Sequence, residues 1–274
     1  LKTLQERLML FAGVGRMESE TSQWSYLSAP APTLGEFVTT KPQLGFSVRL
    51  KDGVHAFANF TQSASPNARF PDTPETGDSI EIGLKAGRER LSGSLTYFDA
   101  TRENIQVGIF NNITSVTTFE LSGEERARGV EAEIQFNPSR NLQLLGSYAF
   151  LDTEVVSDRQ RPARVGTELA NAPEHSIRLW AKYEVEGGPL DSLWLGLGYL
   201  YTSDLRPGDN PARFRLMADA WSRFDAAVGY TSRFGSRRVE WRANFENLTD
   251  EDYLGVALHR GAPFSAKLSA TLRF

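Results

Sequence analysis

The sequence contains no cysteine, and this excludes disulfide bonds, a thiol nucleophile and thiolate metal sites. Its three histidines, His55, His175 and His259, are too far apart along the chain to form a recognisable metal motif. No apolar run approaches the roughly 20 residues that a membrane-spanning helix needs. The acidic residues outnumber the basic ones by 34 to 30, which argues against a nucleic-acid-binding protein, because such proteins carry a basic surplus.

Recognisable catalytic patterns are also missing. A serine nucleophile needs a positioned base and oxyanion donors, and no G-x-S-x-G turn occurs. Glu131 and Glu133 would lie on one face of a strand, as paired catalytic acids would, but a polar strand face accounts for them as well. The sequence therefore predicts a protein that is not an enzyme and that has no resident cofactor or metal.

What the sequence does contain is a recurring alternation of apolar and polar residues. The stretch 264–274 reads F-S-A-K-L-S-A-T-L-R-F, which puts six apolar residues on one side of an extended strand and five polar residues on the other. A side-chain period of two indicates a strand whose two faces meet different environments. In water such a terminal strand would be an aggregation hazard unless it pairs, and closure into a membrane barrel removes the free edge.

Alternating segments recur along the whole chain and predict about twelve strands of an all-β, antiparallel fold. Their apolar positions before the terminal stretch are Leu8, Leu10, Ala12 and Val14; Leu44, Phe46, Val48 and Leu50; Val54, Ala56, Ala58 and Phe60; Ile80, Ile82 and Leu84; Leu91, Leu95 and Tyr97; Val130, Ala132, Ile134 and Phe136; Leu142, Leu144, Tyr148 and Phe150; Ile177, Leu179, Ala181, Tyr183 and Val185; Leu193, Leu195, Leu197, Tyr199 and Tyr201; Phe224, Ala226, Val228 and Tyr230; and Val239, Trp241, Ala243 and Phe245.

The connections between these segments alternate between short and long. Tight turns are expected at Lys51, Gly87, Pro138, Gly188 and Gly235, and long loops at 63–78, 103–121, 151–173 and 203–220, among others. All short turns would then lie at one end of the sheet, which is typical of outer-membrane barrels with short periplasmic turns and long outer loops. Aromatic residues near the strand ends fit the lipid–water boundary. A soluble β-sandwich is the alternative, since its strands also alternate.

Five stretches resemble the C-terminal half of TonB-dependent siderophore receptors of Gram-negative outer membranes. They are P-E-T-G-D-S-I-E-I-G-L-K at 74–85, L-S-G-S-L-T-Y-F-D-A-T-R-E-N-I at 91–105, R-G-V-E-A-E at 128–133, N-A-P-E-H-S at 171–176 and N-F-E-N-L-T-D-E-D-Y at 244–253. Each motif alone is weakly specific, but all five occur in the family's order.

The resemblance implies that residues 1–274 form the C-terminal part of an outer-membrane barrel of about 22 strands. The plug domain and the earlier strands would be absent from this chain, whose Leu1 begins in mid-pattern, so we expect a processed or excised piece. The implied function is import of ferric siderophores with energy from the TonB complex, iron arriving as part of the ligand. The implied partners also include outer-membrane lipid and the barrel-assembly machinery, through the last strand and Phe274. A complete twelve-stranded outer-membrane hydrolase and a soluble β-sandwich binding domain are the alternatives.

Two groups of candidate site residues follow from this interpretation. Aromatic and polar side chains in outer loops could contact a ferric chelate, and charged side chains on the polar strand faces would line the barrel lumen, because charges are costly against lipid. The ligand candidates are Trp24, Tyr26, Phe110, Phe119, Tyr201, His259 and Arg260. The lumen candidates are Arg49, Lys85, Glu131, Glu133, Arg178, Lys182, Glu240, Arg242 and Lys267. Packing in loops or in an aromatic girdle, and simple solvation of a wet wall, are the corresponding alternatives.

We also expect the strands of this chain alone to form an open sheet. Closure of about twelve strands would give a much narrower pore than closure of 22. The first and last strands would then be the edges of the sheet.

Overall fold

The computed structural model describes residues 2–3, 7–23, 33–67, 69–111, 114–206, 217–235, 237–255 and 259–273. Within these ranges, thirteen strands form an antiparallel sheet whose hydrogen-bonded order follows the sequence from β1 to β13. The strands are β1 (Lys2–Thr3), β2 (Leu8–Gln23), β3 (Thr33–Lys51), β4 (Val54–Ser65), β5 (Glu75–Arg88), β6 (Leu91–Asn111), β7 (Val116–Phe136), β8 (Leu142–Asp158), β9 (His175–Glu184), β10 (Leu193–Thr202), β11 (Trp221–Phe234), β12 (Arg237–Glu246) and β13 (Ser265–Arg273).

Helical structure is confined, in the ranges just given, to the short 3-10 helices η1 (Pro162–Arg164) and η2 (Gly188–Leu190). No helix among the described residues has the length and apolar character needed to cross a bilayer.

The all-β antiparallel fold is confirmed, with the two-residue β1 as an addition to the expected strands. The short connections also lie where the sequence predicts them. They join β3 to β4, β5 to β6, β7 to β8, β9 to β10 and β11 to β12. β1 and β13 are the first and last strands of this hydrogen-bonded order, and that the sheet is open stays a prediction.

The predicted loop at 103–121 is wrong. β6 continues to Asn111 and β7 begins at Val116, so that only residues 112–115 separate them. β8 likewise extends to Asp158, beyond its predicted end near Phe150. In β6 and β7 the reason is that the outer segments carry charged side chains on both faces, as described below, so the period-two pattern that marks a strand is absent although the backbone is paired.

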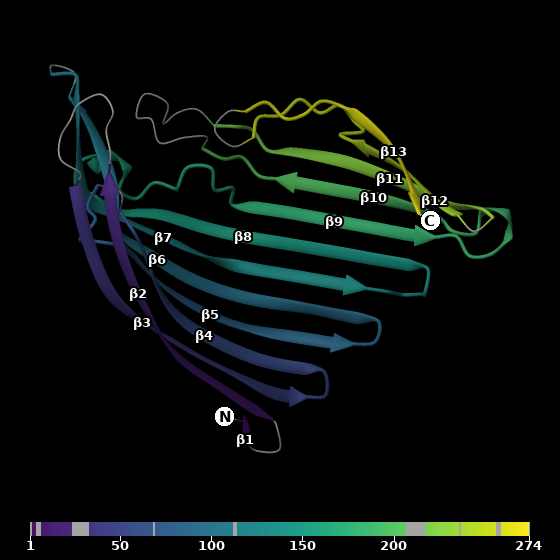
Figure 1. The fold of residues 1–274 in the computed structure, drawn as a ribbon, viewed down its shortest axis with the longest axis horizontal. Helices are drawn as coiled ribbons and strands as arrows, with labels where there is room; N and C mark the ends of the chain where they lie inside the picture. Colours follow the sequence, from purple (N-terminus) through teal and green to yellow (C-terminus); the bar gives the residue numbers. More distant parts are fainter. Residues whose placement is uncertain are drawn as a thin grey trace. The chain divides into compact units, whose positions relative to one another are not determined.

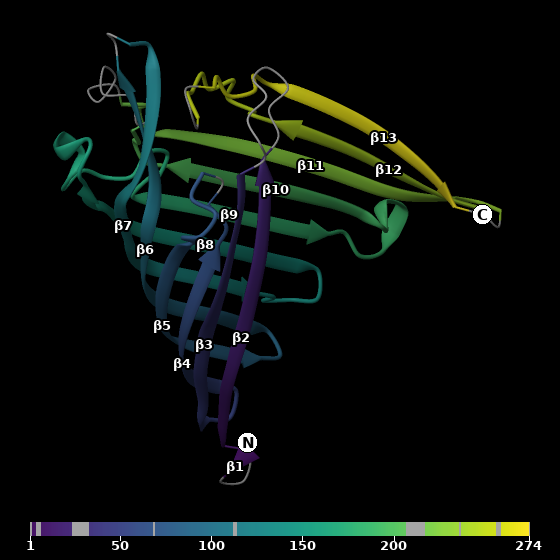
Figure 2. The same cartoon turned by 60° about the vertical axis from the view of Figure 1, so that its left-hand side comes forward.

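The chain folds as two compact units. Unit 1 comprises Leu1–Leu84, Thr96–Gly129 and Asp152–Leu169, and unit 2 comprises Lys85–Leu95, Val130–Leu151 and Ala170–Phe274. β2, β3 and β4 lie side by side in unit 1, and β9 to β13 lie side by side in unit 2 (Figure 1, Figure 2).

The register of unit 2 separates its residues cleanly onto two faces, because directly opposite residues of paired strands share a face. We define the apolar face of unit 2 by Leu179, Ala181, Tyr183, Leu195, Leu197, Tyr199, Ala226, Val228, Tyr230, Trp241, Ala243, Leu268, Ala270 and Leu272. We define the polar face of unit 2 by Arg178, Trp180, Lys182, Trp194, Gly196, Gly198, Asp225, Gly229, Thr231, Glu240, Arg242, Asn244, Lys267, Ser269 and Thr271.

No other segment among the described residues covers the apolar face. Leu268 is 80% exposed and Leu197 is 52% exposed, values far above those of a buried core. Exposed apolar surface of this extent marks a surface that contacts another apolar phase or partner.

Unit 1 shows the same separation in β2, β3 and β4. Leu10 lies opposite Phe46, and Phe46 lies opposite Ala58, so these apolar side chains share a face. Together with Ile80 and Ile82 they border an apolar groove of about 920 Å³.

Candidate functional site

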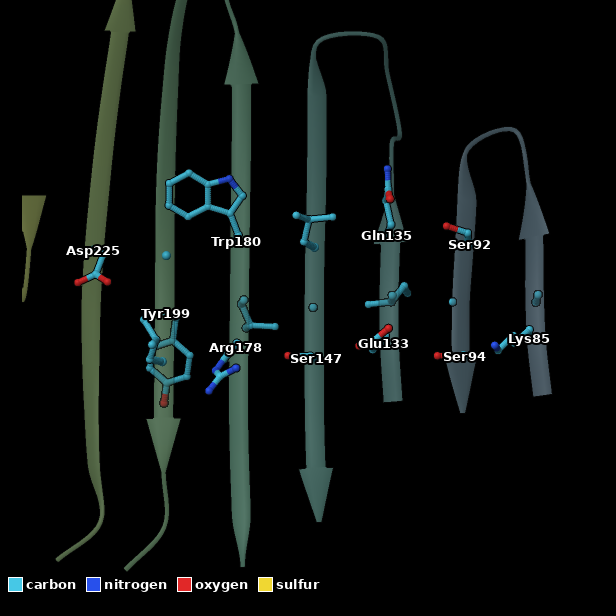
Figure 3. Close-up of a pocket in the computed structure, with 18 residues that line it drawn as sticks. Lys85, Ser92, Ser94, Glu133, Gln135, Ser147, Arg178, Trp180, Tyr199 and Asp225 are labelled. Carbon is cyan, nitrogen blue, oxygen red and sulfur yellow. The ribbon is translucent and has the colours of Figure 1, made fainter. Parts of the chain in front are cut away.

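The polar face of unit 2 is hollowed into a pocket of about 730 Å³. Residues of seven neighbouring strands, β5 to β11, line it, and Figure 3 shows their side chains. Its polar lining consists of Lys85 from β5, Ser92 and Ser94 from β6, Glu133 and Gln135 from β7, Ser147 from β8, Arg178 from β9 and Asp225 from β11. A pocket with this lining can form hydrogen bonds and ion pairs, but it offers no paired nucleophile and base.

Charges of both signs line this pocket. Asp225 is already engaged, because Arg223 donates from Nη2 to Oδ2 at 2.8 Å and the backbone N–H of Asn247 donates to Oδ1 at 2.8 Å. Glu133 and Arg178 make no ion pair with any residue that the structure describes. Both side chains are therefore available to a bound molecule or to another protein segment.

Two tryptophans lie flat on the polar face because glycines leave room beneath them. A Cβ atom added at Gly196 would lie 2.3 Å from the ring of Trp180, and one added at Gly229 would lie 2.1 Å from Nε1 of Trp194. Figure 3 shows the Trp180 ring extending from β9 over β10. Only glycine fits at these positions without displacing the rings.

Cations flank the second of these rings. Lys182 Nζ lies 5.3 Å and the Arg242 guanidinium 5.7 Å from the centroid of Trp194, within the range of cation–π attraction. The polar face thus presents aromatic surface and positive charge together.

The stretch 244–253 folds around Asn247, whose side chain is fully buried. Its Nδ2 donates to the carbonyls of Glu251 at 2.9 Å and Ala262 at 3.0 Å, and its Oδ1 accepts from the Glu251 N–H at 2.9 Å. Asp250 Oδ1 accepts the N–H of Phe264 at 2.8 Å, directly before β13. In this structure the N-L-x-D-x-x-Y motif therefore fixes the loop between β12 and β13 and the start of the last strand.

The tyrosine of the motif lies beside a second pocket, of about 600 Å³. Tyr253 stacks on Trp221 with ring centroids 4.1 Å apart, and its hydroxyl accepts from Arg223 Nη1 at 3.2 Å. Gly261 leaves space for the Tyr253 ring, because an added Cβ would lie 2.2 Å from it.

A bidentate ion pair lines the same pocket. Arg260 donates from Nε and Nη2 to the two oxygens of Asp252, at 2.8 and 2.7 Å. These hydrogen bonds, opposed by slight desolvation, hold the pKa of the Asp252 carboxyl below its usual value and raise the pKa of Arg260. Both side chains are largely exposed, so a ligand can reach them.

The predicted ligand candidates do not come together as one site. Arg260 lines the pocket of about 600 Å³, and the neighbouring His259 is exposed. Phe119 belongs to β7 rather than to a loop, and it packs under the Arg69 guanidinium, which lies 3.7 Å from the ring centroid. Tyr201 lies opposite Ile177 in β9, on the apolar side of the strand, which favours the girdle alternative for it.

The remaining ligand candidates cannot be placed. Trp24 and Tyr26 lie outside the described residues. The backbone of Phe110 belongs to β6, not to the predicted loop, and its side chain lies outside the described part.

The predicted lumen residues do share polar faces within their units. Lys182 lies in one row with Asn244 and Lys267, and Arg242 and Glu240 lie on the same face of β12. Lys85, Glu133 and Arg178 line the pocket of about 730 Å³, and Glu131 lies on the same side of β7 as Glu133. In unit 1, Arg49 lies opposite His55, away from Phe46 and Ala58. That these faces line a lumen stays a prediction.

Sequence reasoning missed the charge pairs of unit 1. Arg126 pairs with Asp99, Arg128 pairs with Asp152 at 2.7 Å, and Arg102 bridges Glu75 and Glu125 at 3.3 and 2.8 Å. Asp99 and Arg102 are three residues apart on β6 and therefore lie on opposite faces.

A buried ion cluster closes the end of β8. Asp158 is 3% exposed and accepts from Arg161 Nε and Arg164 Nη1, each at 3.0 Å. The backbone N–H groups of Gln160 and Arg161 also donate to it. The spacing D-x-x-R in the sequence was the available signal for this cluster. No group of three side chains suited to bind a metal ion occurs among the described residues.

Comparison with known proteins adds the family. The model of the family described as "TonB dependent receptor-like, beta-barrel" matches residues 5–248, most of the chain. The chain belongs to the TonB-dependent receptor β-barrel family. The resemblance inferred from the five sequence stretches is thereby confirmed.

Curated relatives of this TonB-dependent receptor chain are distant but extensive. It is 25% identical to the ferrichrome receptor FcuA of Yersinia enterocolitica, over 100% of this chain and 37% of that protein. It is 27% identical to the ferrichrome outer membrane transporter/phage receptor of Escherichia coli, over 84% of this chain and 31% of that protein. The chain thus spans about a third of the length of these relatives.

Solved structures show the same fold. The ferric preacinetobactin receptor BauA of Acinetobacter baumannii superposes with a TM-score of 0.80 at 21% identity, over 97% of this chain and 40% of that one. The ferric citrate transporter FecA superposes with a TM-score of 0.78 at 15% identity, over 96% of this chain and 42% of that one. The receptor fold is therefore retained although few residues are identical.

Proposed function

We propose that this chain is the C-terminal barrel portion of a Gram-negative outer-membrane receptor that imports ferric siderophores with energy supplied through TonB. The observation that carries the proposal is the family match over residues 5–248, combined with strand faces that are apolar on one side and polar on the other. Relatives named as ferrichrome receptors and a structural neighbour named as a ferric preacinetobactin receptor support the substrate class.

The apolar faces are the lipid-contacting surface in this proposal. Every second residue of a membrane strand meets lipid, and Leu197 and Leu268 satisfy that requirement because they are exposed in the described part of the chain. The polar faces, with Arg49, Lys85, Glu131, Glu133, Arg178, Lys182, Glu240, Arg242 and Lys267, are the lumen wall.

The outer ends of β6 and β7 extend beyond the membrane. Each strand has 21 residues, whereas a tilted transmembrane strand needs about 9–11. Past Tyr97 on β6 the side that carried Leu91 and Leu95 carries Asp99, which is paired with Arg126. Ion pairs on both faces fit an aqueous surface and would be costly against hydrocarbon.

The loop pocket with Arg260 is the described place best suited to contact a ligand. Trp221 and Tyr253 provide apolar area, and Arg260 and Asp252 provide polar groups that orient a chelate. Trp24, Tyr26, Phe110, Phe119 and His259 remain candidates for further contacts. Iron enters as part of the ligand, and we assign no catalytic residue and no resident cofactor. Assembly of the barrel would use the last strand and Phe274.

The test is uptake of radioactive ferrichrome by cells that depend on the complete receptor. We expect uptake that requires both the receptor and TonB, and Arg260→Ala to weaken ferrichrome binding by about tenfold through loss of charged hydrogen bonds. Lys51→Ala, at an exposed turn, is the matched control and should bind normally. Receptor-dependent uptake that persists without TonB would contradict the energy coupling. Absence of binding for ferrichrome and other ferric siderophores would contradict the substrate class.

A further inference from the structure

Three arginines of unit 2 lie directly opposite one another across three strands. Arg233 of β11 pairs in register with Arg238 of β12, and Arg238 pairs in register with Arg273 of β13. We call these three residues the arginine row. All three side chains are exposed. The row lies at the tight-turn end of these strands, next to the turn between Phe234 and Arg237.

The row is poorly neutralised by its surroundings. Arg273 is paired with Glu240, with Nε 3.1 Å from a carboxylate oxygen. Arg233 and Arg238 have no carboxylate partner among the residues that the structure describes. Further cations, Arg242 and Lys267, lie on the same face of the same strands.

This arrangement opposes the stability of the sheet. Like charges directly opposite on paired strands are destabilising. The chain as a whole is acidic, so an accumulation of cations at one turn does not follow from its composition. Positions that break a local rule without internal compensation are expected at functional surfaces.

The face of the sheet on which the row lies distinguishes between two kinds of anionic partner, lipid headgroups and protein carboxylates. Arg238 is two residues from Glu240 and four from Arg242, so the row belongs to the polar side of the sheet. The apolar side, with Tyr230, Trp241 and Leu272, faces the opposite way. If the apolar side contacts lipid, as the proposed function holds, lipid headgroups are not the neighbours of the row.

We infer that the arginine row is a docking surface for an acidic segment of a separate polypeptide, which reaches the receptor at its tight-turn end. Guanidinium groups bind carboxylates bidentately, and three of them in register match a run of aspartate or glutamate side chains in an extended segment. The partner neutralises the repulsion that the free sheet retains. The inference rests on the proposed function only for the lipid-facing side, and it predicts binding that does not involve a siderophore.

The experiment measures binding of a fluorescent octaglutamate peptide to the complete receptor in detergent, by anisotropy. We expect saturable binding that is lost near 1 M salt, where the screening length is about 3 Å. The triple variant Arg233→Gln, Arg238→Gln, Arg273→Gln should bind about tenfold more weakly, since each exposed ion pair contributes modestly. Octaglutamine should not bind.

A control variant removes three cations from other tight turns, Lys51→Gln, Arg88→Gln and Arg140→Gln, all exposed. It should bind the peptide as the parent does. A structural role for the row predicts that the triple variant unfolds at lower temperature, whereas our inference predicts an unchanged or higher midpoint together with weaker binding.

Three results would overturn the inference. Equal binding by the triple and control variants would show that the row is not the site. No binding to the parent would show that the row is closed, for instance by another segment of the receptor itself. If the triple variant differed from the parent only in nanodiscs containing phosphatidylglycerol, the row would be assigned to lipid headgroups. Siderophore uptake, measured in parallel, would report separately on the proposed function.

Discussion

In unit 1 the arginines of neighbouring strands face carboxylates, whereas at the tight-turn end of unit 2 they face one another. Arg126 meets Asp99 and Arg128 meets Asp152, but Arg233 meets Arg238, and Arg238 meets Arg273. The first arrangement is complete within the chain and serves the fold. The second is incomplete among the residues that the structure describes, and in our inference a partner supplies the missing charge. Whether an arginine faces a carboxylate or another arginine on the neighbouring strand thus distinguishes structural charges from charges available for binding.

The largest expected effect tests whether the charges of unit 1 are neutralised within the chain. Asp158→Asn keeps the shape of the side chain but removes the charge that faces Arg161 and the buried Arg164. Breaking a buried ion cluster costs about 3–5 kcal/mol. Urea unfolding followed by tryptophan fluorescence should show this loss in the free energy of unfolding. The exposed neighbour Arg159→Gln is the control and should change it by less than about 0.5 kcal/mol.

The next effect concerns a part of the polar face of unit 2 that is distant from the arginine row, and it tests how tightly that part is packed. Gly196→Ala places a methyl group against the Trp180 ring, and overpacking of this kind costs about 1–3 kcal/mol. The same unfolding measurement applies. Adding Trp180→Leu should recover part of the loss, and a purely additive double variant would show that the ring does not rest on this glycine.

A smaller effect is expected for an exposed pair of unit 1. Asp99→Asn and Arg126→Gln should each lower the free energy of unfolding by about 1 kcal/mol or less, because the two side chains are partly exposed. A double-mutant cycle should give a coupling energy of the same order and sign. A coupling energy indistinguishable from zero would show that the Asp99–Arg126 pair does not stabilise unit 1.

The opposite sign is expected in unit 2. Arg238→Gln removes a charge that lies between two others, so the free energy of unfolding should rise by about 0.5 kcal/mol. Thermal unfolding at low salt should show the gain, and added salt should reduce it, because screening already weakens the repulsion. Destabilisation by Arg238→Gln would mean that the row has a partner within the receptor.

The smallest effect concerns the exposed pair of Asp252 and Arg260. Because Arg260 holds the pKa of Asp252 below its ordinary value of 3.8, the pair contributes fully above that value and is lost as pH falls through the lowered pKa. Hydrogen exchange at the amides of Gly255 and Gly261, which are bonded across this loop, should therefore be constant from about pH 7 to 5, after correction for intrinsic rates, and should become faster in acid. Arg260→Gln removes the partner, so exchange at these amides should already be faster at pH 7 and the further acceleration in acid should be lost.

The sequence predicts well those parts of the strands whose two faces meet different environments, because each environment determines the residues on its face. In 264–274 each position is assigned to a face by its neighbours, and the register of β12 and β13 confirms the assignment at Leu268 and Leu272. The outer halves of β6 and β7 were missed because Asp99, Arg102 and Arg126 place charge on both faces. No single-strand pattern reveals a pairing between residues 27 positions apart.

The candidate site was less predictable for a related reason. Which charges share a face follows from the period of two, and this held for Lys182, Arg242 and Lys267. Which charges meet depends on register between strands. For Arg233 and Arg238 the short turn after Phe234 made the register readable in the sequence, but Arg273 needed the structure.

The glycines beneath Trp180 and Trp194 have a consequence for movement along the polar face. An indole that stands up from a sheet is an obstacle, whereas an indole that lies along it adds breadth and little height. Gly196, Gly198 and Gly229 thus let the polar face of unit 2 carry two bulky side chains that project little from the sheet. A molecule that moves along the polar face of unit 2 would contact the flat faces of these rings instead of projecting ring edges.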